Sequence, residues 1–311
     1  MRILVVGAGA TGGYFGGRLL EASQDVTFLV RPRRAAELAS SGLLIQSPCG
    51  DVSIPQPATV LAENLHTAFD LILLSCKAYD LEGAIDSFAP AVGPDTLILP
   101  VLNGMRHLDV LDRRFGPSHV LGGLCVISAA LEPGGRILHL NDLHLLAFGE
   151  RDGSRSARVE AIASACSGVR FASRLSGVIL QEMWEKWVFI ATCAGITCLL
   201  RANIGDIVAA GAADFASQLL DECNAIATSQ GFSTRPASLE KNRTIITQPA
   251  SPLAASMFRD IERRAPVEAD HMIGDLLRRS EQRQIASPLL RVAYAHLKTY
   301  EARRARETAP S

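Results

Sequence analysis

Short apolar runs and segments with helical spacing alternate along the first half of the chain. The apolar runs are rich in valine, isoleucine and leucine and lie at Arg2–Val6, Val26–Val30, Asp70–Ser75, Thr96–Leu102, Val120–Ile127, Leu143–Phe148 and Val169–Ala172. The helical segments lie at Ala10–Ala22, Arg33–Ser40, Leu81–Phe88 and Ser154–Cys166. This alternation predicts a parallel sheet covered by helices on both faces. A turn and closely spaced strands within Gly134–Gly149 predict an antiparallel addition.

From about Ser176 the strand pattern stops. Long segments with helical spacing follow, at Val178–Leu200, Ala212–Gln230, Pro236–Thr247, Pro266–Gln282 and Pro288–Arg304. We therefore predict an α/β domain over residues 1–175 and an all-helical domain over residues 176–311. The apolar stretch Trp187–Leu200 is short for a membrane span, so we interpret it as a buried helix and expect no membrane attachment.

Composition narrows the functional classes. The chain has 311 residues, with 31 Lys and Arg against 32 Asp and Glu and a formal net charge of -1. No basic excess favours a nucleic-acid partner. The cysteines are odd in number and form no C-x-x-C pair; they stand at positions 49, 76, 125, 166, 193, 198 and 223. This usage argues against a disulfide framework and fits a cytoplasmic protein.

The scattered histidines do not predict a metal site. His139 and His144 flank Asn141 and Asp142, but histidines at strand ends are more typical of surface polar groups than of metal ligands. We therefore expect no metal.

A glycine-rich loop follows the first predicted strand. Its sequence, Gly7-Ala8-Gly9-Ala10-Thr11-Gly12, is a G-x-G-x-x-G pattern at the start of a helical segment. Gly7 would permit the tight turn, Gly9 would let the backbone approach a pyrophosphate, and Gly12 would let the helix pack against the strand. The helix N-terminus would then face the phosphates. We interpret Gly13, Gly16 and Gly17 as close-packing positions.

The end of the second predicted strand indicates which dinucleotide is bound. Sites specific for NAD usually carry Asp or Glu there, whereas this chain carries Arg31, followed by Arg33 and Arg34. A guanidinium pairs with a 2′-phosphate, so the sequence favours NADP(H), with Arg31 as the principal candidate and Arg33 or Arg34 as support. Lys77 and Asn103 follow two further predicted strands and are expected at the same edge of the sheet.

With these residues placed, the chain resembles the ketopantoate reductase (2-dehydropantoate 2-reductase) family, whose C-terminal domain belongs to the 6-phosphogluconate dehydrogenase-like superfamily. The resemblance covers nearly the whole chain. It rests on the glycine loop, Arg31, Lys77-Ala78-Tyr79, Asn103-Gly104, Trp184-Glu185-Lys186, Ser256-Met257 with Asp260, and Glu268. It implies a Rossmann domain and a helical domain, with a small-molecule substrate between them and a homodimer formed through the helical domain.

The resemblance also implies roles for particular residues. Lys186 matches the catalytic lysine, and Glu268 matches a carboxylate that hydrogen-bonds a substrate hydroxyl near the cofactor. Ser256 matches a residue that contacts the substrate carboxylate, and Asp260, one helical turn on, would orient it. Asn103 matches an asparagine near both the nicotinamide and the substrate. Lys77 matches a lysine that reaches toward the cofactor.

The chain departs from the family on the helix that carries Lys186. Positions 190 and 194 share a helix face with Lys186, and the family typically has asparagine at both, whereas this chain has Ile190 and Ala194. A third expected asparagine falls at Ile204. Three amides are thus replaced by apolar side chains, which predicts a drier substrate pocket.

The resemblance implies an NADPH-dependent reduction of 2-dehydropantoate to (R)-pantoate, in pantothenate and coenzyme A biosynthesis, with a lysine as general acid. Reduction of a more apolar 2-oxo acid is the alternative that Ile190 and Ala194 favour. A non-catalytic NADPH-binding sensor is an alternative of another class, although the presence of both Lys186 and Glu268 argues against it. A β-hydroxyacid dehydrogenase of the 6-phosphogluconate type is disfavoured by Ile190.

Overall fold

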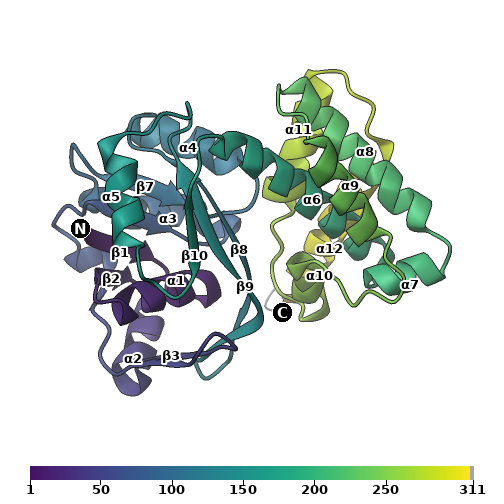
Figure 1. The fold of residues 1–311 in the computed structure, drawn as a ribbon. Helices are drawn as coiled ribbons and strands as arrows, with labels where there is room; N and C mark the ends of the chain where they lie inside the picture. Colours follow the sequence, from purple (N-terminus) through teal and green to yellow (C-terminus); the bar gives the residue numbers. More distant parts are fainter. Residues whose placement is uncertain (309–311) are drawn as a thin grey trace. The chain divides into compact units, whose positions relative to one another are not determined.

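The computed structural model describes residues 1–308 and divides the chain into two compact units. Unit 1 comprises Met1–Leu102 and His107–Leu180, and unit 2 comprises Asn103–Arg106 and the chain from Gln181 onward. Each unit is described by itself (Figure 1).

Unit 1 contains a parallel sheet with the strand order β5-β2-β1-β6-β7. Its strands are β1 (Arg2–Val6), β2 (Asp25–Leu29), β5 (Thr59–Val60), β6 (Leu71–Leu74) and β7 (Leu97–Pro100). Val6 pairs with Leu29 on one side and with Leu74 on the other. The carboxyl ends of β1, β2 and β6 therefore lie side by side, which is where such sheets bind ligands.

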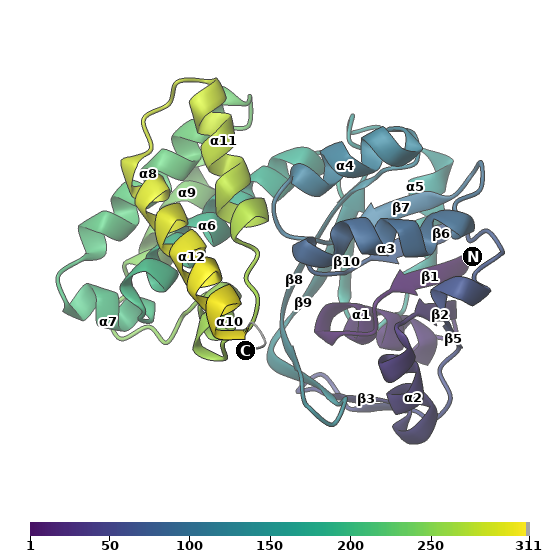
Figure 2. The same cartoon turned by 180° about the vertical axis from the view of Figure 1, so that it is seen from behind.

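The helices of this half of the chain follow the strands. They are α1 (Ala10–Glu21), α2 (Pro32–Ser41), α3 (Leu81–Phe88), α4 (Arg106–Phe115) and α5 (Ala157–Ala165), with the short turns η1 (Ala62–Asn64), η2 (Ala78–Asp80) and η3 (Ala89–Ala91). Figure 2 shows α3 on the near side of the parallel strands.

Unit 1 also contains a second, mixed sheet with the order β10-β9-β3-β4, in which β8 pairs with β9. Its strands are β3 (Leu43–Gln46), β4 (Val52–Ile54), β8 (Gly122–Leu131), β9 (Ile137–Gly149) and β10 (Ala172–Leu175). The predicted antiparallel addition is confirmed, because β8 and β9 run antiparallel, but Gly134–Gly149 forms a turn and the single strand β9 rather than closely spaced strands.

The helix α1 packs against both sheets, and its glycines make this possible. A Cβ atom on Gly16 would lie 2.6 Å from Phe28 in β2, and one on Gly17 would lie 2.7 Å from Ile45 in β3. Gly13 likewise would meet Ile137 of β9 at 2.4 Å. The prediction that these glycines are close-packing positions is confirmed.

Unit 2 is helical. Its elements are α6 (Ile179–Leu200, which begins in unit 1), α7 (Ile204–Ala209), α8 (Ala213–Ser229), α9 (Pro236–Ile246), α10 (Ser256–Glu262), a π-helical turn η4 (Asp270–Gly274), α11 (Asp275–Gln282) and α12 (Pro288–Thr308). A Cβ atom on Gly195 of α6 would touch Leu219 of α8 and Ala293 of α12, so α6 is the central helix. It is long and apolar enough to cross a membrane, but 72% of its most apolar window is buried inside the structure, which agrees with the predicted buried helix.

The predicted class, a Rossmann-type α/β unit with a helical unit after it, is confirmed. The strands β3, β4 and β5 and the helices α4 and α7 were not predicted. The predicted start of the helix Pro266–Gln282 is wrong, because residues 265–268 are not helical and helical structure starts at Ala269. Glu268 therefore precedes the helix rather than standing in its first turn.

Candidate active site

The glycine loop has the geometry that a pyrophosphate needs. Gly7 has a φ of 93°, which only glycine adopts without strain, and its amide donates to the carbonyl oxygen of Leu29 at 3.0 Å. A Cβ atom on Gly9 would meet no atom within 4 Å. Gly9 is the N-cap of α1, no side chain caps that helix, and its first turn holds no acidic residue. The backbone amides of Ala10 to Gly12 lie in the first turn and have no acceptor within the helix, so they stand at its positive end.

Gly12 serves packing rather than ligand contact. A Cβ atom there would lie 2.1 Å from the backbone oxygen of Gly7 and 2.1 Å from the Oγ atom of Ser75. The Ser75 hydroxyl donates to the backbone oxygen of Val6 at 3.0 Å, so it joins the ends of β6 and β1. The close approach of α1 to β1 thus depends on the missing side chain.

Three arginines follow β2 and differ in their surroundings. Arg31 is 78% exposed and donates from Nη2 to Asp80 at 2.7 Å, and this hydrogen bond and charge raise its pKa. Arg33 is 87% exposed and pairs with Glu37. Arg34 is largely buried and donates from Nε to the backbone oxygen of Ala8 at 3.0 Å, so it supports the glycine loop itself.

Lys77 and Asp80 bracket the turn after β6. Lys77 is exposed and is the N-cap of η2, and its carbonyl oxygen accepts from the amide of Asp80 at 2.9 Å. Since Asp80 also binds Arg31, the loops that follow β2 and β6 are joined across the end of β1. Unit 1 therefore brings together the glycine loop, Arg31 and Lys77.

Lys186 is half-buried on α6, beside the buried Glu185. Glu185 accepts from the backbone amide, Nε and Nη2 of Arg235 at 2.9, 2.7 and 2.5 Å. Burial alone would raise the pKa of Glu185, but the hydrogen bonds and charge of Arg235 lower it overall. This ion pair fixes how α6 is rotated and hence the face on which Lys186 stands.

A cluster in unit 2 forms around His271, which sequence reasoning missed. Asn103 belongs by its contacts to unit 2, and its backbone hydrogen-bonds His271. A Cβ atom on the adjacent Gly104 would lie 3.1 Å from Cδ2 of His271. Burial lowers the pKa of His271, although Glu268 and other charged groups nearby also act on it. No local pattern could have revealed this contact, because Asn103 and His271 are far apart in the sequence.

The same turn is joined to the helix that carries Lys186. The indole Nε1 of Trp187 donates to the backbone oxygen of Met272 at 2.9 Å, and the Trp187 ring is fully buried. Met272 lies in η4, and isolated π-helical turns are frequent at functional sites. Unit 2 therefore links the elements that carry Lys186, Glu268 and Asn103.

Ser256 and Asp260 are placed differently. Ser256 is exposed at the start of α10, and the amide of its neighbour Ala255 donates to the hydroxyl of Thr197 at 3.4 Å. Thr197 is three helical turns beyond Lys186 on α6, which is about 16 Å along the helix axis. The charge of Asp260 acts on Tyr300. Ser256 is thus anchored at the far half of α6.

The three apolar replacements are largely buried. Ala194 is 3% exposed, Ile204 is fully buried, and Ile190 is half-buried on the turn after Lys186. Asn203, beside Ile204, caps α7 by accepting from the amide of Asp206 at 2.9 Å. The side chains next to Lys186 on its helix face therefore offer no amide.

The fold and these residues define a class, a dinucleotide-binding α/β unit followed by a helical unit with a lysine on its central helix. Comparison with known proteins gives the family. The model of ketopantoate reductase PanE/ApbA matches residues 3–153, and that of the ketopantoate reductase PanE/ApbA C terminal matches residues 178–301. The chain belongs to the ketopantoate reductase family and is an oxidoreductase that acts on CH–OH groups.

Three relatives illustrate the range of similar proteins. An uncharacterized oxidoreductase, YkpB, from Bacillus subtilis is 40% identical over 97% of this chain and 99% of that protein. The solved 2-dehydropantoate 2-reductase from Methylococcus capsulatus is 27% identical with a TM-score of 0.87, over 98% of both chains. A D-mandelate dehydrogenase, solved with NADH and anilino(oxo)acetate, has a TM-score of 0.87 but 20% identity over 98% of this chain and 99% of that chain, so it shows the shared fold alone.

Proposed function

We propose that this protein reduces a 2-oxo acid with NADPH, with 2-dehydropantoate as the first candidate substrate and (R)-pantoate as product. The observation that carries the proposal is the joined set of elements in unit 2, in which Trp187 and His271 tie the helix of Lys186 to Glu268 and Asn103. Two of these elements carry the proposed catalytic residues, Lys186 and Glu268.

A nicotinamide dinucleotide fits unit 1. The uncapped N-terminus of α1 and the open space at Gly9 suit a pyrophosphate, and the exposed Arg31 suits a 2′-phosphate. Arg31 would exchange its surface ion pair with Asp80 for the phosphate at little cost, because exposed pairs contribute only about 0–1 kcal/mol. Lys77 would approach the same cofactor from the turn after β6. Arg31 is therefore the reason for proposing NADPH rather than NADH.

The proposed chemistry assigns a proton to Lys186. When bound, NADPH supplies the hydride that reduces the carbonyl carbon. Lys186 would donate a proton to the carbonyl oxygen, which would otherwise carry a full negative charge. Glu268 would hold a substrate hydroxyl and Asn103 would position the carbonyl group. Ser256, supported by Asp260, would contact the substrate carboxylate from α10, which is anchored at Thr197 three helical turns beyond Lys186.

A second substrate class is supported by Ile190 and Ala194. Side chains without hydrogen-bonding groups beside Lys186 would bind an apolar substituent better than a hydroxylated one. We therefore propose a 2-oxo acid with a branched alkyl or aryl group as the alternative. Conversion of 2-dehydropantoate would place the protein in pantothenate biosynthesis, and we propose a cytoplasmic location and a homodimer formed through the helical unit.

The test is a panel of 2-oxo acids assayed with NADPH and NADH in parallel. We expect turnover with NADPH, and we expect Lys186→Ala to lower kcat about 100-fold or more while NADPH affinity is kept. Lys241→Ala removes the same charge from an exposed site on α9 and is the matched control. NADPH binding without turnover of any 2-oxo acid would contradict the proposal and favour a sensor.

A further inference from the structure

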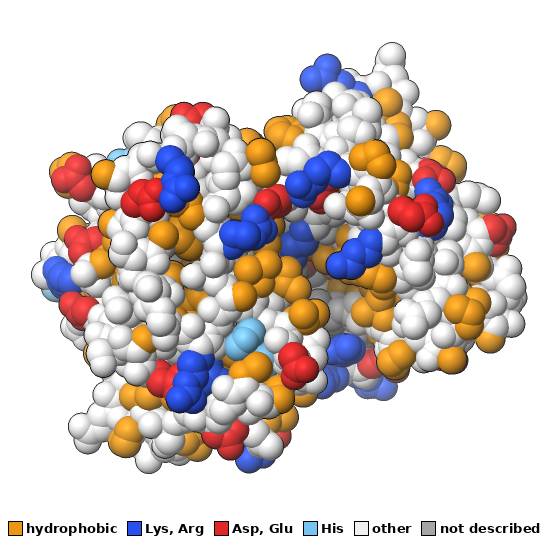
Figure 3. Space-filling model, viewed as in Figure 1, with side chains coloured by type: hydrophobic (Ala, Val, Ile, Leu, Met, Phe, Trp, Pro, Cys, Tyr) orange, Lys and Arg blue, Asp and Glu red, His pale blue; other side chains and the backbone are white. Residues whose placement is uncertain are grey.

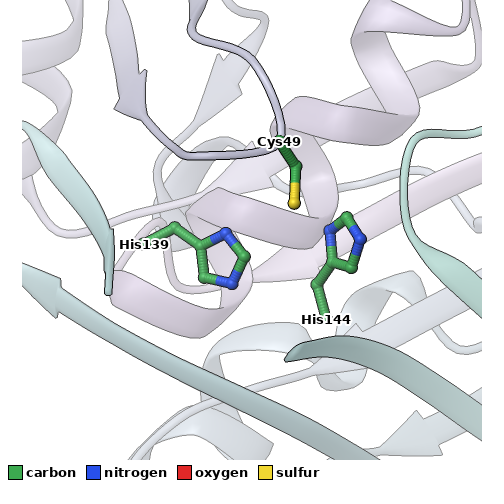
Figure 4. A group of neighbouring side chains, drawn as sticks. All are labelled: Cys49, His139 and His144. Atoms are coloured by element: carbon green, nitrogen blue, oxygen red, sulfur yellow. The ribbon is translucent and has the colours of Figure 1, made fainter. Parts of the chain in front are cut away.

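A thiol and two imidazoles meet in unit 1, on the mixed sheet. One donor atom from each of Cys49, His139 and His144 lies within 4.8 Å of the other two. Figure 4 shows the sulfur of Cys49 pointing between the two rings. His139 is 5% exposed, while Cys49 and His144 are half-buried, so the group can be reached from solvent. The expectation that His139 is a surface group is wrong.

An irregularity in β9 brings the two histidines together. In a regular strand, residues five apart point to opposite faces of the sheet. Here His144 pairs with Ile127 and His139 pairs with Ala129, so five steps along β9 match two steps along β8. The extra residues bulge out, and the two rings stack with centroids 5.4 Å apart. Bulges of this kind re-aim side chains and are over-represented next to functional sites.

The hydrogen bonds and the orientation of the two rings decide which nitrogen of each histidine can bind a metal. Nε2 of His139 lies 3.1 Å from the backbone oxygen of Leu143, which can only accept, so Nε2 carries the proton and Nδ1 presents a lone pair. Nδ1 of His144 lies 2.7 Å from the hydroxyl of Tyr14, and Figure 4 shows that this nitrogen, next to the ring carbon that bears the side chain, faces Cys49 while Nε2 faces away. Ligation at Nδ1 would therefore exchange the hydrogen bond to Tyr14 for a metal bond. His139 keeps the donation of its second N–H that metal-binding histidines make.

Among the remaining neighbours, some groups favour a bound cation and others oppose it. The hydroxyl of Ser47 lies 2.9 Å from Nδ1 of His139 and accepts from the amide of Cys49 at 3.1 Å, so ligation at Nδ1 exchanges one hydrogen bond for a metal bond. The charge of Arg18 opposes a cation, and that of Asp142 favours one. A thiolate at Cys49 would offset Arg18.

From this geometry we propose that Cys49, His139 and His144 form a binding site for Zn²⁺ or a similar borderline-soft divalent ion. One thiolate and two imidazoles are ligands that Zn²⁺ takes, with a fourth position left to water. Tetrahedral ligation sets the donors about 3.3–3.7 Å apart, so the side chains close by about 1 Å. Binding would release the thiol proton of Cys49 as the S–Zn bond forms. The proposal is independent of the reductase function.

The test uses the full-length protein, freed of metal and titrated with Zn²⁺, and with Co²⁺ as a spectroscopic probe. We expect one ion per chain, a thiolate-to-cobalt absorption band, and a Tm that rises with Zn²⁺ concentration. Cys49→Ser and His144→Gln should each weaken binding about tenfold or more. Cys76→Ser and His66→Gln remove a half-buried thiol and an exposed imidazole of the same unit and are the matched controls. Equal losses in all four variants would reveal adventitious binding and overturn the proposal.

A measurement on the unaltered chain covers the case in which a variant fails to fold. Zn²⁺ should slow alkylation of Cys49 about tenfold or more and leave the rate at Cys76 unchanged, as read by mass spectrometry of the labelled peptides. Equal rates at Cys49 with and without Zn²⁺ would refute the site.

Discussion

Gly9 and Gly12 lie three residues apart in the glycine loop, and the structure predicts opposite consequences for giving each a methyl group. In Gly12→Ala the new Cβ atom would lie 2.1 Å from the backbone oxygen of Gly7. The helix α1 has no room to retreat, because a Cβ atom on Gly13 would already meet Ile137 at 2.4 Å on its other side. Overpacking usually costs about 1–3 kcal/mol, and with both sides closed we expect about 3 kcal/mol.

In Gly9→Ala the methyl group meets no atom within 4 Å, and the φ of −79° suits any residue. Replacing glycine at a helix N-cap by alanine costs about 0.5–1 kcal/mol. The methyl group would occupy the space proposed for the pyrophosphate. We therefore expect a nearly normal stability but an NADPH affinity lowered about tenfold or more, which is at least about 1.4 kcal/mol.

The assay separates the two effects. Far-UV circular dichroism follows the unfolding of both units. Both tryptophans, Trp184 and Trp187, lie in unit 2, so their fluorescence follows the unfolding of unit 2 alone and serves as an internal reference. Gly12→Ala should lower the Tm of unit 1 by roughly 6–12 °C, and Gly9→Ala by no more than about 4 °C. NADPH affinity comes from a fluorescence titration. The reasoning would be refuted if Gly9→Ala bound NADPH with the affinity of the unaltered protein, or if Gly12→Ala had the same Tm as the unaltered protein.

Three further predictions concern charge and burial. Arg31→Ala should lower kcat/KM with NADPH roughly 10- to 100-fold and leave that with NADH unchanged, since a charge-assisted hydrogen bond contributes about 1.5–3 kcal/mol. Arg155→Ala removes another exposed, ion-paired guanidinium of unit 1 and should change neither value. Equal losses with both cofactors in Arg31→Ala would contradict the assignment. Because Arg235 lowers the pKa of Glu185, this carboxylate contributes stability above its unfolded pKa of about 4.5, and the contribution is lost as the pH falls through the lower folded value. Tryptophan fluorescence should therefore show that the stability of unit 2 falls below about pH 4.5. In Glu185→Gln the stability of unit 2 should fall less over the same pH range. Burial raises the pKa of Cys166 to about 11 and of the deeper thiols to about 12, so alkylation of the folded protein at pH 8 should spare them and label the half-buried pair. The spared thiols are Cys166, Cys193, Cys198 and Cys223, and the labelled ones are Cys49 and Cys76.

The sequence determined the parts of this protein that depend on local pattern. The alternation of apolar strands and helices gave the parallel sheet, and the glycine loop gave the turn between β1 and α1 to the residue. These features are predictable because a turn with positive φ, a helix N-terminus and a buried strand each require particular residues within a short stretch of chain. Arg31 and Lys77 followed from the same rule, since side chains after parallel strands meet at one edge.

Only the tertiary structure decided which distant segments meet. The strands β3 and β4 were missed because they are short and gain their stability from β9 rather than from their own pattern. His271 became part of the Asn103 cluster, and Cys49 joined two histidines, through contacts between segments far apart in the sequence. His139 and His144 share a face only because β9 bulges, and a period of two read from the sequence predicts the reverse. Local chemistry limits what each residue can do, whereas packing and register choose its partners.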